Sequence, residues 1–192
     1  MTNNSGVSIK DLISSAVAAC RAFAKCSENF FHFEINNRWR GWENWLTVDI
    51  ARCLNRKSVV PFASYSECSR GRDTLKTTMD LFVKEPQKIA VEIKVNYWGE
   101  AEIGAFAERG EKRSLPKGAI KDIEKLRKAG PHVQKVFMMS IVFESRKALR
   151  DYKRVFDRDQ KVLKGFNFKW YDCSAYPNGG HNLLLVISDI KL

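Results

Sequence analysis

The fold is decided by residues 77–95, which read TTMDLFVKEPQKIAVEIKV. Two largely apolar runs, residues 77–83 and 88–95, flank a short charged link that contains Pro86. Apolar, β-branched runs on either side of a proline-containing link are typical of two strands joined as a hairpin. We therefore expect an antiparallel pair of strands here, and the rest of the chain is interpreted around it.

The second predicted strand carries charge on one of its two faces. Side chains alternate across a strand, so the apolar residues at positions 89, 91, 93 and 95 share a face that a helix can cover. Glu92 and Lys94 then lie together on the other face, where charges are costly without partners. In a hairpin, Asp80 of the first strand can lie across from Glu92, because neighbouring strands are about 4.8 Å apart.

The remaining sequence alternates between helical and strand patterns. Apolar spacing predicts helices at residues 8–26, 42–55, 117–129 and 146–156, and further strands at 59–65, 133–143, 166–171 and 183–190. Residues 30–35 are of uncertain type, and residues 96–116, with three glycines, suggest a long loop or an irregular helix. This order predicts an α/β fold with a mixed central sheet, as one domain over residues 1–192.

Glu43 lies at the start of the second predicted helix. At about 100° per residue it falls within about 60° of the apolar stripe formed by Leu46, Ile50 and Leu54. A carboxylate directed toward the core is unexpected, which makes Glu43 a candidate site residue. The structural alternative is that the free N–H groups and dipole of the helix start stabilise this carboxylate.

The chain is strongly basic. Its 192 residues contain 33 Lys and Arg against 22 Asp and Glu, a net charge of +11. Such an excess favours a polyanionic partner, most commonly nucleic acid, although a solvated basic surface is the simpler alternative. The basic helix at residues 146–156 has the same two interpretations.

Several other classes of protein are not indicated. The five cysteines contain no C-x-x-C pair, so we expect reduced thiols and neither a zinc framework nor a disulfide scaffold. Glycine-rich phosphate loops and paired histidines do not occur. Apolar runs are too short to cross a bilayer, and a secretory signal pattern is not present, so we expect a cytoplasmic protein without a membrane partner.

Together these pieces resemble the PD-(D/E)XK nuclease superfamily. The matching residues are Glu43 in a helix, Asp80 on a strand, and Glu92-Ile93-Lys94 on the next strand. The αβββαβ order and the helix at residues 117–126 match as well, so the resemblance covers a core of about residues 42–143. Met79 stands where the family motif has proline. The resemblance implies a restriction-endonuclease-like core with an added N-terminal helix and a C-terminal helix and strands.

The resemblance also implies a metal-dependent mechanism. Asp80 and Glu92 would hold Mg²⁺, with Mn²⁺ as a substitute, and the Ile93 carbonyl would assist. Glu43 would bind a metal directly or through water. Lys94 would orient or help deprotonate the attacking water and offset developing charge. The alternative for Lys94 is a plain salt bridge to Glu92 or Asp80.

The expected activity is that of an endonuclease, with DNA favoured over RNA because the superfamily mostly cuts DNA. Residues that could contact nucleic acid are Arg70, Arg72, Lys76, Tyr97 and Trp98. Specificity would be built into loops or supplied by a homodimer. Two alternatives stay open: a non-catalytic nucleic-acid-binding module that keeps the fold, and an interaction protein whose basic face binds an acidic partner.

Overall fold

The computed structural model describes residues 6–25, 40–54, 58–63, 78–98, 117–143, 145–160, 166–174 and 182–190. Its helices are α1 (Ile9–Lys25), α3 (Arg40–Leu54), α5 (Lys117–Arg127) and α6 (Arg146–Gln160). Its strands are β1 (Val59–Pro61), β2 (Leu81–Val83), β3 (Ile89–Trp98), β4 (Gln134–Phe143), β5 (Phe166–Asp172) and β6 (Asn182–Ile190). The mixed α/β class that the sequence predicts is confirmed.

The strands form one sheet in the order β1-β2-β3-β4-β6-β5. β3 and β4 are parallel, and the other neighbouring pairs are antiparallel. A parallel pair needs a crossover connection, and α5 lies in the chain between β3 and β4. The long β3 and β4 strands, paired along their whole length, therefore form the centre of the sheet.

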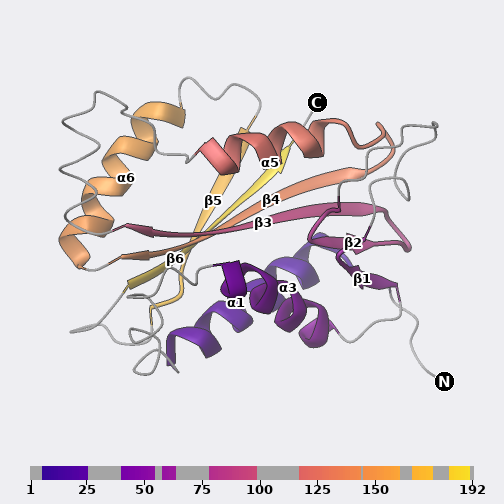
Figure 1. The fold of residues 1–192 in the computed structure, drawn as a ribbon, viewed down its shortest axis with the longest axis horizontal. Coiled ribbons are helices and arrows are strands. Elements are labelled where there is room, and N and C mark those ends of the chain that lie inside the picture. Colours follow the sequence, from indigo (N-terminus) through magenta and orange to yellow (C-terminus); the bar gives the residue numbers. More distant parts are fainter. Residues whose placement is uncertain are drawn as a thin grey trace.

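Helices cover both faces of this sheet (Figure 1). α1 and α3 pack on one face, against an apolar cluster that includes Ile89, Val91 and Ile93 of β3. α5 and α6 pack on the opposite face, against a second cluster that includes Ala90. Because residues 89–91 alternate between the two clusters and Ile93 returns to the first, β3 has the face assignment that the sequence predicts.

Most predicted elements are confirmed, with ends shifted by a few residues. Ser8 precedes α1, accepts a hydrogen bond from the Asp11 N–H at 3.2 Å, and donates its own N–H to the Asp11 carboxylate at 2.9 Å. This reciprocal capping supports the prediction that the helix starts after Ser8. The predicted segment at residues 30–35 lies outside the described residues.

The first two strands of the predicted core are shorter than expected. β1 ends at Pro61, because Phe62 has a positive φ of 54° that an extended strand does not allow. β2 begins only at Leu81, so the placement of Asp80 inside a strand is wrong: it immediately precedes the strand. Its backbone still stays beside β1, since its carbonyl accepts the Phe62 N–H at 2.8 Å.

The predicted end of the third strand is also wrong. Residues 96–98 were expected in the loop region, but β3 continues through Asn96 and Tyr97 to Trp98. These residues pair with Ile141, Val142 and Phe143 of β4. The partner strand, which lies far away in the sequence, extends β3 beyond the segment that its own apolar alternation marks.

Candidate functional site

Asp80 and Glu92 face each other across the hairpin. In the β2–β3 register Leu81 pairs with Val91 and Phe82 with Ala90, so the next step of this register places Asp80 opposite Glu92. The Ile93 N–H donates a hydrogen bond of 2.6 Å to Asp80 Oδ2. The carboxyl group of Asp80 is therefore turned toward β3 and fixed beside Glu92.

Glu92 lies close enough to this carboxyl group for a side-chain interaction that lowers the pKa of Asp80. Burial, together with the negative charges of Glu43 and Asp122, raises the pKa of Asp80 from 3.8 to about 6, although the hydrogen bond from Ile93 and the interaction with Glu92 lower it. The ionised form of the Asp80 carboxyl group is therefore disfavoured at this position.

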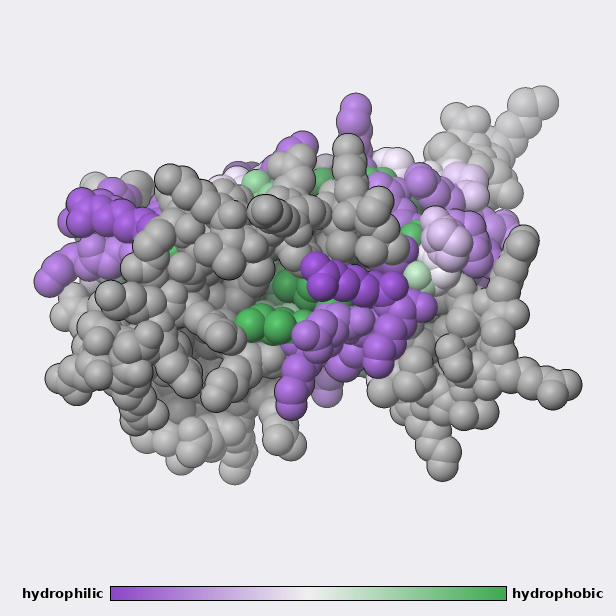
Figure 2. All heavy atoms as spheres, turned by 90° about the horizontal axis from the view of Figure 1, so that it is seen from above, coloured by the Kyte–Doolittle hydropathy of each residue, from purple (hydrophilic) through white to green (hydrophobic). Residues whose placement is uncertain are grey.

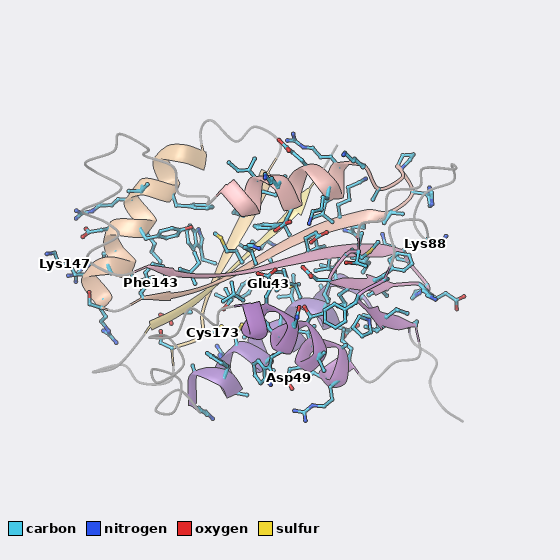
Figure 3. The ribbon with its side chains drawn as sticks, viewed as in Figure 1. Glu43, Asp49, Lys88, Phe143, Lys147 and Cys173 are labelled. Atoms are coloured by element: carbon cyan, nitrogen blue, oxygen red, sulfur yellow. The ribbon has the colours of Figure 1, made fainter. Side chains whose placement is uncertain are left out.

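Glu43 reaches the site from the opposite helical layer. It lies in the first turn of α3, and Figure 3 shows it beside the sheet near the middle of β3. Its carboxylate oxygens lie 3.2 and 3.1 Å from Lys94 Nζ. The inward direction that its helical position predicts is therefore observed, and its partner is the lysine of the Glu92-Ile93-Lys94 motif.

Lys94 is held as a cation. Burial lowers its pKa, but the charges and hydrogen bonds of Glu43 and Asp122 outweigh burial and raise the pKa above the ordinary value of 10.5. The ammonium group therefore stays protonated near neutral pH. This protonation favours a role in orienting water and stabilising negative charge over a role as the base.

Two residues of α5 belong to the same group of charged side chains, and the sequence analysis did not single them out. We call this group the charged cluster; its members are Glu43, Asp80, Glu92, Lys94, Asp122 and Lys125. Asp122 Oδ1 lies 2.7 Å from Lys125 Nζ, and Asp122 Oδ2 lies 3.6 Å from Lys94 Nζ. Lys125 Nζ also lies 4.0 Å from Glu92. The sequence could have indicated Asp122, because helical spacing places it on the same buried stripe as Ala119, Ile123 and Leu126.

The short β2 strand makes this cluster possible. β2 pairs with only three residues of β3, Ile89–Val91, so it leaves the β3 edge beyond Glu92 free of this partner. Side chains from the α3 layer can therefore reach Lys94 around that edge. In this way Glu43 and Asp122, from helices on opposite faces of the sheet, contact the same ammonium group.

The oxygen ligands at the site suit a hard divalent cation. Mg²⁺ keeps several waters and is commonly bound through one or two carboxylates. The pair of Asp80 and Glu92, which lie opposite one another in the hairpin register, fits that requirement. Within the described ranges, His, Cys, Asp and Glu side chains form no group of three or more placed to hold a metal ion. Binding of Mg²⁺ here would therefore depend on this pair of carboxylates, with water as the remaining ligands.

The other candidate residues are those expected to contact nucleic acid. Arg70, Arg72 and Lys76 lie outside the described residues, and only the backbone of Tyr97 and Trp98 is described.

Seen from above, the described part of the surface is largely hydrophilic (Figure 2), in keeping with the charge of the chain. None of the described helices combines the length and the apolar character of a membrane-spanning segment.

Comparisons with protein-family models, with curated proteins and with solved structures found no match for this chain. The function must therefore be inferred from the geometry and chemistry of the cluster itself.

Proposed function

We propose that this protein is a Mg²⁺-dependent nuclease that hydrolyses phosphodiester bonds in DNA, with a core of the PD-(D/E)XK type. The observation that carries the proposal is the pair of Asp80 and Glu92, opposite one another across a hairpin, with Lys94 on the same face of β3. The order α3-β1-β2-β3-α5-β4 supports the fold assignment. The net charge of +11 supports a polyanionic substrate.

Each residue has a distinct role in the proposed reaction. Asp80 and Glu92 would hold the metal, and the Ile93 N–H fixes the orientation of Asp80. A bound Mg²⁺ supplies an activated water and neutralises charge on the phosphate. Lys94, protonated and held by Glu43, directs its ammonium toward the reacting groups and offsets negative charge that develops on the phosphate.

The raised pKa of Asp80 is consistent with this role. A carboxyl group with a pKa of about 6 is mostly ionised above neutral pH, so it is available to a cation under ordinary conditions. Burial and the negative charges of Glu43 and Asp122 raise this pKa, and a bound divalent cation would stabilise the ionised carboxylate against both effects. Metal binding should therefore be favoured at this position.

Cleavage assays test the proposal directly. Wild-type protein, Asp80→Asn and Lys94→Ala should be incubated with plasmid, linear and single-stranded DNA and with RNA, in Mg²⁺, Mn²⁺ or EDTA. Asp151→Asn and Lys88→Ala are matched controls, since these residues lie on α6 and in the hairpin link. We expect metal-dependent cleavage by the wild type and both controls, and loss of cleavage in the two site variants.

Two outcomes would contradict the proposal. If the site variants cut as well as the wild type, another site or a contaminant is responsible. If the wild type binds nucleic acid but cuts none of these substrates and binds no divalent cation, the alternative of a non-catalytic binding module gains support.

A further inference from the structure

Asp122 occupies a position where a carboxylate is costly. It lies on the stripe of α5 that packs against the sheet and is only 6% exposed. A buried carboxylate is destabilising unless it is paired. Its neighbours on the stripe, Ala119, Ile123 and Leu126, are apolar, so packing alone does not explain an aspartate here.

The contacts of Asp122 connect it to Lys94. One oxygen of Asp122 pairs with Lys125 on its own helix at 2.7 Å, and the other lies 3.6 Å from Lys94 Nζ on β3. Lys94 Nζ is also 3.1 Å from Glu43. A single ammonium group is thus shared between two carboxylates that come from opposite helical layers.

We propose that Asp122 is a positioning residue for Lys94, which together with Glu43 holds the ammonium group at the site. The part of this inference that concerns cleavage rests on the proposed nuclease function. The sharing of Lys94 between Glu43 and Asp122 does not, and it can be tested without metal or substrate.

A purely structural explanation would treat Asp122 as half of a helical ion pair. α3 contains a close match, because Asp49 pairs with Arg52 at the same spacing and at 2.8 Å. The carboxylate side chains are equally buried, at 10% exposure for Asp49 and 9% for Asp122. Figure 3 shows Asp49 well separated from Glu43 and β3, so Asp49→Asn reproduces the local change of Asp122→Asn outside the site.

A double-mutant cycle on the metal-free protein tests the sharing. The rate at which an amine-reactive ester acylates Lys94, followed by mass spectrometry of the peptide, reports how firmly the ammonium group is held. The variants are Glu43→Gln, Asp122→Asn, their combination and the Asp49→Asn control, each checked for native circular dichroism. Asp122→Glu, which keeps the carboxylate, serves as the conservative variant.

We expect each single change to raise acylation of Lys94 by less than about threefold, because one carboxylate remains. The double variant should raise it by about tenfold or more, beyond the product of the single effects. Asp49→Asn should have no effect, and Asp122→Glu should stay close to the wild type. A double variant that equals the product of the single effects would overturn the inference. Should Asp122→Asn not fold, Asp122→Ala takes its place in the cycle.

Kinetics separate this inference from the proposed function. If the wild type cleaves DNA, Asp122→Asn should lower kcat by about 10–100-fold with KM little changed, as expected when a supporting residue is lost. An unchanged kcat would refute the positioning role while leaving the nuclease proposal intact. If the wild type cleaves nothing, the nuclease proposal fails, and the acylation cycle still decides whether the two carboxylates share Lys94.

Discussion

The two faces of β3 share one backbone but differ in chemistry at Glu92 and Lys94. On the face toward α1 and α3, Ile89, Val91 and Ile93 are fully buried in an apolar cluster. On the face toward α5, Glu92 is only 2% exposed and shares its surroundings with Lys94 and Asp122. Burying charge beside a central strand weakens a fold unless other contacts compensate.

This difference suggests a division of roles between the faces. The apolar face holds the strand in place, and the charged face uses that rigid support to keep ionisable groups close together. Natural sequences depart from the rules of good packing mainly at functional sites. The charged face of β3 is such a departure, whereas the apolar face follows the rules throughout.

The largest effect should come from the charged face. Glu92→Gln removes one carboxylate of the pair, so we expect metal-dependent cleavage to fall by at least about 10²-fold while the protein stays folded. Cleavage rates and circular dichroism measure the two quantities. Glu85→Gln, in the exposed hairpin link, is the matched control and should cleave normally. Normal cleavage by Glu92→Gln would contradict a functional role for the charged face of β3.

A substitution on the apolar face of β3 should instead lower the stability of the protein. Ile93→Ala empties a fully buried position but keeps the backbone N–H that orients Asp80, so we expect unfolding to become easier by about 2–5 kcal/mol. Urea unfolding measures this change. Cleavage per folded molecule should stay within a few-fold of the wild type. A folded Ile93→Ala protein without activity would show that the two faces are not separable.

Sequence alone predicted the parts of the site that depend on local periodicity. Alternation placed Glu92 and Lys94 on one face, the hairpin placed Asp80 opposite Glu92, and helical spacing directed Glu43 inward. Asp122 was missed even though the same spacing test applies to it. Its helix has the pattern of an ordinary covering helix, and Asp122 lies outside the short motif of Asp80, Glu92 and Lys94.

The remaining differences arise from contacts that are distant in the sequence. β3 extends to Trp98 because β4 pairs with it along its whole length, and β4 is separated from it by α5. The position of β6 between β4 and β5 is equally non-local. Local patterns predict where strands occur, but they carry little information about which strands become neighbours.

The pH dependence of stability sharpens the comparison. The pKa of Asp80 is raised from 3.8 to about 6, so its protonated form favours the folded state, and that stability is lost as pH rises from about 4 through about 6. In EDTA, Asp80→Asn should therefore be more stable than the wild type above about pH 7, by up to about 3 kcal/mol. The difference should vanish below about pH 4. Urea unfolding across this range measures it, and a pH-independent difference would contradict the electrostatic origin.

The smallest effects should distinguish the site from an ordinary surface pair. Lys125 and Arg154 each pair with an aspartate at the same helical spacing, but Lys125 also lies 4.0 Å from the buried Glu92. Because exposed pairs contribute little, Arg154→Ala should change the free energy of unfolding by less than about 0.5 kcal/mol.

Lys125→Ala should lower the free energy of unfolding by more, about 1–2 kcal/mol, because it leaves the buried carboxylates of Glu92 and Asp122 without one of their cations. The expected loss is modest because the Lys125 side chain is partly exposed. Urea unfolding of both variants under one set of conditions measures the contrast. If the two substitutions have the same effect, the carboxylates on the charged face do not depend on Lys125. Lys94 would then be their principal counter-ion, and the double variant Lys94→Ala with Lys125→Ala should be no less stable than Lys94→Ala alone.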